Sequence, residues 1–162
     1  PEVGPEAYRG ALADADRRSS SPLALYVHLP FCRERCTFCG CHVIATSRRD
    51  VAARYLDALE AEAGLLAAAL PRRRRLGELH LGGGTPTYYD PEQLARLVGA
   101  IRAHFTIDDD AELTAEVDPR VTTHEHLDTL ASLGFSRLSI GVQDFTPEVQ
   151  AAIGRNQTAA ET

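Results

Sequence analysis

Strand-like and helical segments alternate along this chain of 162 residues. The strand-like runs are short and mainly apolar, and the stretches between them are long enough to form helices. Such alternation is typical of βαβ units, in which neighbouring strands are parallel and the crossovers are right-handed. The predicted strands are "LALYVHL" (23–29), "ELHLG" (78–82), "ELTAEV" (112–117) and "RLSIGV" (137–142).

The predicted fold class is therefore α/β, and two architectures are compatible with it: an open doubly wound sheet, or part of a (β/α) barrel. A closed eight-stranded barrel needs roughly 250 residues, and only four strands are visible here. We therefore expect an open or incomplete sheet. The end of the chain, "IGRNQTAAET", follows a short predicted helix without closing the fold, so we expect the chain to be part of a longer protein.

Apolar periodicity and capping residues mark the helices between the strands. Apolar side chains recur every three or four positions between 56 and 70 and between 94 and 105, which predicts two amphipathic helices. Asp90 as the N-cap, with Gln93 three positions later, predicts a capping box at the start of the second helix. Two further helices are predicted at 123–133, ending at a left-handed Gly134, and at 146–154.

The acidic composition limits the partners of the chain. A formal net charge of -6 at pH 7 argues against a nucleic-acid or membrane-surface binder, which needs a broad basic face. No segment resembles a signal peptide or a membrane span. We expect a cytoplasmic monomer with no nucleic-acid and no membrane partner. Residues 1–22 are predicted to be a flexible N-terminal extension with at most one helical turn, followed by a domain over residues 23–162.

All four cysteines lie within the segment 32–41, directly after the first predicted strand. As disulfides they would close only very small loops, and cytoplasmic thiols stay reduced. A zinc site normally uses two C-x2-4-C pairs held well apart, whereas one residue separates Cys39 from Cys41. A redox pair of Cys36 and Cys39 leaves Cys32 without a role. Three thiolates within eight residues suit an iron–sulfur cluster with one open iron, and zinc remains the alternative.

The other predicted strands are also followed by unusual loops, and parallel strands bring such loops together at the carboxyl edge of the sheet. Glycines after the second strand let a ligand approach the backbone closely. They are not followed by the Lys-Ser/Thr of a phosphate loop. Glu116, at the end of an apolar strand, is either a solvated rim carboxylate or a ligand-binding group. The three loops are "GGGTP" (82–86), "EVDP" (116–119) and "GVQDF" (141–145).

The spacing C-x3-C-x2-C, with Phe38 directly before the third cysteine, resembles the cluster-binding loop of the radical S-adenosylmethionine (SAM) superfamily. The resemblance implies a partial radical SAM (β/α) barrel, truncated after about four βα units. It also implies a [4Fe-4S] cluster ligated by Cys32, Cys36 and Cys39. In that superfamily the open iron binds the amino and carboxylate groups of SAM. One electron then cleaves SAM to methionine and a 5′-deoxyadenosyl radical, which abstracts a hydrogen atom.

Five motifs together resemble the oxygen-independent coproporphyrinogen III oxidase family: "LYVHLPFC…CTFCGC", "GGGTPT", "EVDPR", "GVQDF" and "GRNQ". They run from Leu25 to Gln157 and cover the early part of that family's catalytic domain. The resemblance implies oxidative decarboxylation of two propionate side chains of coproporphyrinogen III to vinyl groups, giving protoporphyrinogen IX in haem biosynthesis. It further implies a tetrapyrrole substrate, an electron donor such as a flavodoxin-type protein, and a second SAM beside the first.

The same resemblance assigns cofactor contacts by motif position. The residues implied for the first SAM are Tyr26, Gly83 and Glu116, and those implied for the second are Phe38, Gly84, Thr85, Gln143 and Arg155. Arg155 also fits a surface arginine near a helix end, and His28 either orients the cysteine loop or fills the strand end. The related radical SAM haem chaperones usually carry an aromatic residue in place of Cys41, so "C-x-F-C-G-C" favours the oxidase.

Overall fold

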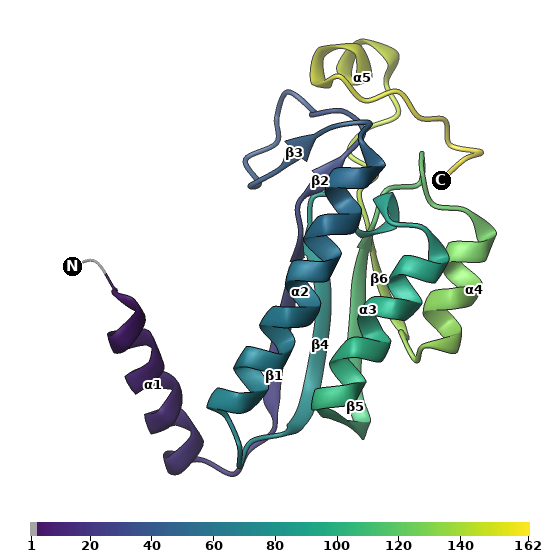
Figure 1. Cartoon of the computed structure of the whole chain (residues 1–162). Helices are drawn as coiled ribbons and strands as arrows, with labels where there is room; N and C mark the ends of the chain where they lie inside the picture. The colour runs from purple at the N-terminus through teal and green to yellow at the C-terminus, as the bar shows by residue number, and fades with distance from the viewer. Residues whose placement is uncertain (1–2) are drawn as a thin grey trace.

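The computed structural model describes residues 3–162 of the chain. Its centre is a four-stranded sheet with the strand order β1-β4-β5-β6 (Figure 1). Every neighbouring pair of strands in this sheet is parallel, which confirms the prediction from the strand–helix alternation. The strands are β1 (Leu23–Leu29), β4 (Arg75–Gly83), β5 (Thr106–Val117) and β6 (Arg137–Ile140).

Three helices connect these strands, and all three cover the same face of the sheet (Figure 1). A doubly wound sheet carries helices on both faces, whereas a barrel wall carries them on its outer face only. Strands in sequence order with helices on one side therefore confirm the expected partial (β/α) barrel, which is open over the described residues. The connecting helices are α2 (Arg49–Ala69), α3 (Pro91–His104) and α4 (His124–Ser132).

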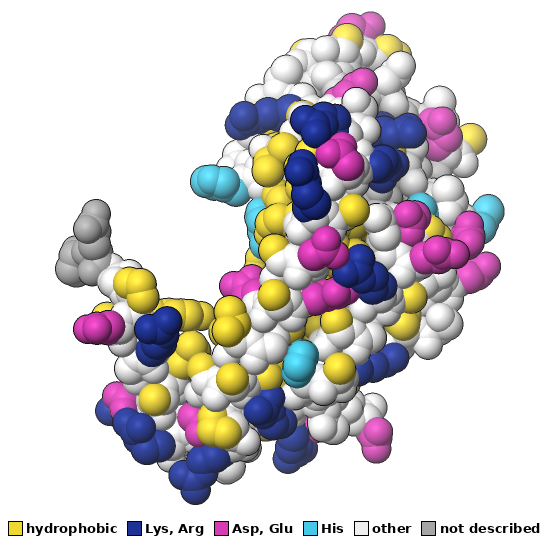
Figure 2. Space-filling view, in the orientation of Figure 1, with side chains coloured by type: hydrophobic (Ala, Val, Ile, Leu, Met, Phe, Trp, Pro, Cys, Tyr) yellow, Lys and Arg dark blue, Asp and Glu magenta, His cyan; other side chains and the backbone are white. Residues whose placement is uncertain are grey.

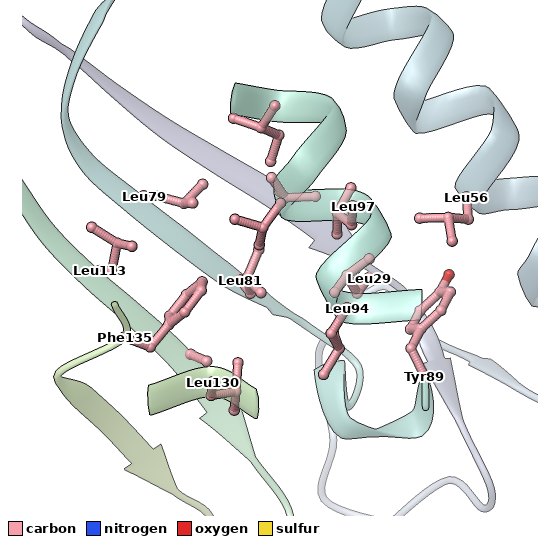
Figure 3. Packing of buried hydrophobic residues seen from close by; sticks show 14 of the residues in the cluster. Leu29, Leu56, Leu79, Leu81, Tyr89, Leu94, Leu97, Leu113, Leu130 and Phe135 are labelled. Atoms are coloured by element: carbon pink, nitrogen blue, oxygen red, sulfur yellow. The ribbon is translucent and has the colours of Figure 1, made fainter. Parts of the chain in front are cut away.

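The hydrophobic core lies between the sheet and these helices (Figure 3). Leu79 and Leu81 of β4 and Leu113 of β5 are buried there and belong to one cluster with Leu97 of α3 and Leu56 of α2. Because successive side chains of a strand point to opposite faces, the residues between them lie on the uncovered face of the sheet. That face carries the polar side chains of Tyr26, His28, His80, Thr114 and Glu116.

The helix ends form where the capping residues predicted them. The Asp90 carboxylate accepts the backbone N–H of Gln93 at 2.8 Å, and the Gln93 amide oxygen accepts the backbone N–H of Asp90 at 3.1 Å. Gly134, with a φ of 92°, follows α4 in a left-handed conformation. Gly154, with a φ of 64°, ends α5 (Pro147–Ile153) in the same way. The predicted capping box, the left-handed Gly134 and the helix end at Gly154 are therefore confirmed.

The N-terminal segment is more regular than predicted. Helix α1 (Pro5–Arg18) has 14 residues, where we expected at most one turn. Proline in the first turn and arginines in the last favour both ends of this helix. Asp16 is buried, and its carboxylate accepts the backbone N–H groups of Arg72 and Arg73 at 2.9 and 3.1 Å. This long-range contact holds the end of α1, and the pattern of apolar residues in the sequence does not predict it. The domain division after residue 22 stays a prediction.

Strand boundaries differ from the prediction where the sheet is irregular. β5 begins earlier than predicted, at Thr106, because Thr106 and Ile107 already pair with β4. Residues 108–111 interrupt this pairing, which resumes at Glu112. β6 ends at Ile140, since the chain leaves the sheet before Gln143, whose φ is 67°. No helix of the described residues is long and apolar enough to cross a membrane. Short elements that were not predicted are β2 (Phe31–Cys32), β3 (Ile44–Ala45) and η1 (Pro86–Tyr88).

Candidate functional site

The loops at the carboxyl edge of the sheet enclose an open pocket of about 1280 Å³. The cysteine loop, the loops after β4, β5 and β6, and the segment after α5 all contribute to its lining. Tyr26 lies outside the pocket, on the uncovered face of the sheet. The other predicted site residues line it, and their roles stay predictions: Cys32, Cys36, Phe38, Cys39, Gly83, Gly84, Thr85, Glu116, Gln143 and Arg155.

A short parallel pairing holds the base of the cysteine loop (residues 32–43). β2 and β3 pair Phe31 with Ile44, and the backbone N–H of Ile44 donates to the carbonyl of Pro30 at 2.8 Å. Phe31 is buried and meets the ring of Tyr55 edge to face, with 5.6 Å between the ring centroids. The cysteine loop is therefore closed at its base by strand pairing and anchored in the core by Phe31.

Two of the thiols have hydrogen-bonding partners from distant parts of the chain. The Sγ of Cys32 lies 3.3 Å from the Oγ1 of Thr85. Cys36 is buried, and its Sγ lies 3.8 Å from Nη2 of Arg120 and 3.9 Å from Nη1 of Arg155. Burial raises the pKa of the Cys32 thiol, and the Thr85 hydroxyl partly offsets this effect. The environments of Cys32 and Cys36 are therefore polar and specific.

The three thiols with the spacing C-x3-C-x2-C are the donors available for a cluster. Within residues 3–162, no three His, Cys, Asp or Glu side chains are placed to share one ion. The thiolates of a cluster bind different irons and need not converge on one point. Cys32, Cys36 and Cys39 border the same open pocket, and Cys41 is exposed. Three cysteine thiols on one loop beside an open pocket are a donor set that fits a [4Fe-4S] cluster with an open iron.

The glycine loop packs directly on the base of the cysteine loop. The backbone N–H of Gly84 donates to the carbonyl of Leu29 at 2.9 Å. A Cβ atom on Gly84 would lie 2.6 Å from the carbonyl oxygen of Pro30. Gly83 has a φ of 116°, and a Cβ atom there would lie 2.7 Å from Nδ1 of His28. Both glycines are required for close approach of the two loops, in addition to the SAM contacts predicted for them.

Glu116 is held by groups on the neighbouring strand. One carboxylate oxygen accepts the backbone N–H of Gly83 at 3.2 Å, and the other lies 3.4 Å from Nε2 of His80. Nδ1 of His80 lies 2.6 Å from Oγ1 of Thr114. Sequence reasoning missed His80 and Thr114. Thr114 lies two positions before Glu116, and His80 lies two positions before the first glycine of the glycine loop, so each shares a strand face with the site. Glu116 is thus an oriented, partly exposed carboxylate at the pocket edge.

Tyr26 is connected to this carboxylate through a ring stack. Its ring lies parallel to that of His80, with 5.5 Å between centroids and 15° between planes. Its hydroxyl lies 3.1 Å from Nδ1 of His28, whose Nε2 lies 2.9 Å from the carbonyl oxygen of His42. Burial and the nearby Glu116 raise the pKa of the Tyr26 hydroxyl. Of the two readings of His28, the structure shows the one in which it contacts the cysteine loop.

An ion triad of two buried residues and one partly buried arginine lies beside the cysteine loop. Asp118 is 7% exposed, and its carboxylate pairs with Nη2 of Arg120 at 2.6 Å and with Nη2 of Arg155 at 3.2 Å. Burial alone would raise the pKa of Asp118, but the hydrogen bonds from Arg120 and the charge of Arg155 lower it below its usual value. Arg155 is 6% exposed, so it is not the surface arginine considered as an alternative.

Comparison with known proteins identifies the family. The sequence matches the radical SAM superfamily over residues 26–162. The chain belongs to the radical SAM superfamily. A solved structure described as coproporphyrinogen III oxidase from Escherichia coli, a radical SAM enzyme, has a TM-score of 0.89 and 44% identity; the match covers 98% of this chain and 36% of that one.

Curated relatives carry the same name. The oxygen-independent coproporphyrinogen III oxidase of Escherichia coli K12 is 46% identical over 96% of this radical SAM chain and 33% of its own length. The oxidase of Helicobacter pylori J99 is 47% identical over 86% of this chain and 31% of its own length. The oxidase of Pseudomonas aeruginosa is 41% identical over 99% of this chain and 35% of its own length. The chain thus spans about a third of the length of these relatives.

Proposed function

We propose that this radical SAM chain is the cluster-binding and SAM-binding part of an oxygen-independent coproporphyrinogen III oxidase. The reaction is oxidative decarboxylation of two propionate side chains of coproporphyrinogen III to vinyl groups, giving protoporphyrinogen IX for haem biosynthesis. One observation carries the proposal: the five motifs of the oxidase family, distant in sequence, all supply residues to one pocket. The identity to relatives named as this oxidase supports the same activity.

In this proposal Cys32, Cys36 and Cys39 hold a [4Fe-4S] cluster. When bound, the cluster supplies the electron that cleaves SAM into methionine and the radical that abstracts hydrogen. The chain contributes a loop that is closed at its base by the Phe31–Ile44 pairing. Thr85 and Arg120 hydrogen-bond to two of the sulfurs from outside the loop, as groups behind metal ligands commonly do.

We assign the first SAM to Tyr26, Gly83 and Glu116. The Glu116 carboxylate accepts from Gly83 and faces the pocket edge, so its remaining lone pairs suit the hydroxyl groups of a ribose. The backbone carbonyls and N–H groups of the glycine loop suit the methionine amino and carboxylate groups. The His80 ring stacks on the Tyr26 ring, and its Nε2 lies near the Glu116 carboxylate. His80 therefore links two of the proposed SAM-binding residues.

We assign a second SAM to Phe38, Gly84, Thr85, Gln143 and Arg155. All five of these residues line the same open pocket. The Phe38 ring is 49% exposed, so it can stack on a planar group. Gln143 holds a left-handed backbone, φ 67°, and local strain of this kind concentrates at binding sites.

The proposal extends to partners and location. The tetrapyrrole enters the open side of the pocket. Each propionate gives one hydrogen atom to the SAM-derived radical, releases CO2 and passes one electron to an acceptor. A flavodoxin-type protein supplies the reducing electron. Basic side chains gather at the end of the molecule where β2, β3 and the start of α2 lie (Figures 1 and 2), which suits an acidic donor despite the net charge of -6. We propose a cytoplasmic monomer, where the thiols stay reduced.

A chimera provides the test, because the chain spans about a third of its relatives. The chain replaces the corresponding segment of the Escherichia coli oxidase, and the purified protein is reconstituted anaerobically with iron and sulfide. With SAM, reductant and coproporphyrinogen III, we expect vinyl products and CO2. The Cys36→Ala chimera is the matched control and should release none. Haem binding without CO2 release from an iron-loaded chimera indicates the chaperone function instead, and zinc without iron indicates a structural site.

A further inference from the structure

Two guanidinium groups meet at the sulfur of one cluster cysteine. Nη2 of Arg120 lies 3.8 Å and Nη1 of Arg155 lies 3.9 Å from the Sγ of Cys36. Both distances are within the range of N–H···S hydrogen bonds. The residues come from the loop after β5 and the segment after α5, so only the folded chain brings them to the cysteine loop.

The two arginines are fixed by other contacts. Asp118 accepts from Nε of Arg120 at 3.0 Å and from Nη2 at 2.6 Å, a two-pronged pairing that orients the guanidinium plane. Arg155 donates from Nε to the amide oxygen of Gln157 at 3.0 Å and from Nη2 to the carbonyl of Gly141. The groups that face Cys36 are therefore held in place before any cofactor binds, which limits the entropy lost on forming the N–H···S bonds.

The predicted cluster ligands Cys32 and Cys36 have hydrogen-bonding partners of different charge. Cys32 faces the neutral hydroxyl of Thr85, whereas Cys36 faces two positive charges. Hydrogen bonds to the sulfurs and nearby charge set the reduction potential of an iron–sulfur cluster. A positive donor favours the state that carries one more electron, because the added negative charge is shared with the thiolates. Removal of such a donor therefore makes reduction less favourable.

We propose that Arg120 is a positioning residue that raises the reduction potential of the cluster by hydrogen bonding to the Sγ of Cys36. Arg155 gives the second bond, and Asp118 holds both guanidinium groups. The step affected is the gain of one electron by the oxidised cluster, with dithionite as the reductant in the test. The inference rests on the cluster of the proposed function, and it needs neither the oxidase reaction nor a second SAM.

The test is a redox titration of the anaerobically reconstituted chimera of the proposed function, followed by electron paramagnetic resonance, without SAM. For Arg120→Gln we expect a tenfold smaller equilibrium constant for reduction, which is a shift of about 59 mV to more negative potential for a one-electron couple. Arg120→Lys keeps the positive charge but loses the planar guanidinium. The cluster potential of this variant should therefore lie between those of the wild type and Arg120→Gln. Arg9→Gln is the matched control: it removes the same charge from an exposed position of α1 that does not line the pocket and should leave the potential unchanged.

The outcomes separate this inference from the proposed function. A wild-type chimera that takes up no iron overturns both. An iron-loaded Arg120→Gln protein with the wild-type potential overturns the inference alone, as does an equal shift in Arg9→Gln. If Arg120→Gln holds less than a full cluster, Arg120→Lys decides by the same measurement: a more negative potential supports the inference, and the wild-type potential overturns it.

Discussion

Thr85 places its hydroxyl oxygen 3.3 Å from the sulfur of Cys32, although 53 positions separate the two residues. The contact joins the glycine loop after β4 to the cysteine loop after β1. It exists because β1 and β4 are adjacent and parallel, so both loops leave the same edge of the sheet. The predicted SAM contacts of the glycine loop and the predicted cluster ligands therefore form one continuous surface, and changes in one loop should affect the other.

The cysteines should differ in their importance for iron binding. Alanine at Cys32, Cys36 or Cys39 should abolish iron uptake during anaerobic reconstitution, because each removes one of three soft ligands. Cys41→Ala should keep it, since Cys41 is exposed and is not needed for a cube with one open iron. Iron and sulfide content and the visible spectrum measure the effect. Equal loss of iron in all four variants would contradict the assignment of three ligands.

Gly84→Ala should destabilise the protein even without cofactors. The new Cβ would lie 2.6 Å from the carbonyl oxygen of Pro30, and a backbone atom cannot move away as a side chain can. We expect a loss of about 1–3 kcal/mol in the free energy of unfolding. Urea denaturation of the apoprotein measures this change.

Gly99→Ala is the matched control for that substitution. Gly99 lies within α3, and a Cβ atom there meets nothing within 4 Å. Alanine should therefore stabilise the helix by about 0.5–1 kcal/mol. Equal destabilisation by both substitutions would show that loop contact at Gly84 is not the cause.

His80→Ala should weaken SAM binding without removing any proposed SAM contact. The imidazole stacks under the Tyr26 ring and lies 3.4 Å from the Glu116 carboxylate, so its loss frees both side chains. One hydrogen bond of about 0.5–1.5 kcal/mol corresponds to roughly a 2- to 13-fold rise in Kd. Equilibrium binding of SAM to the iron-loaded protein measures it. His124→Ala, at the exposed start of α4, should leave Kd unchanged, and His80→Gln should recover part of the affinity.

The Asp118 triad predicts a pH dependence of stability. Its arginine partners lower the pKa of Asp118 below the usual carboxyl value. The unfolded chain therefore takes up a proton first as the pH falls. The triad stabilises the fold fully above the ordinary carboxyl pKa of about 3.9, and this stabilisation is lost as the pH falls through the lower pKa of the folded state.

Asp118→Asn tests that dependence. The variant should lose about 2 kcal/mol at pH 7, since a charged hydrogen-bond partner is removed. Its stability should then fall less steeply than that of the wild type between pH 5 and pH 3 by urea denaturation, where these approximate limits bracket ordinary carboxyl titration. Asp128→Asn, at an exposed position of α4, should follow the wild-type profile. Parallel profiles for Asp118→Asn and the wild type would contradict the prediction.

Local pattern determined much of this protein. Strand–helix alternation was sufficient to predict a parallel α/β sheet, because the period of apolar residues reports which element each segment forms. Asp90, Gly134 and Gly154 marked helix ends through their own backbone chemistry. The cysteine spacing indicated the cluster loop, and the carboxyl-edge rule placed the four loops around one pocket.

Tertiary structure alone decided the contacts between those loops. The full length of α1 and the burial of Asp16 depend on a loop 56 positions away. The meeting of Arg155 with Cys36 spans 119 positions, and the stack of Tyr26 on His80 requires β1 and β4 to be neighbours. Sequence periodicity reports only which side of its own strand or helix a residue occupies. Which distant residue it meets there depends on strand order, register and the packing of the whole sheet.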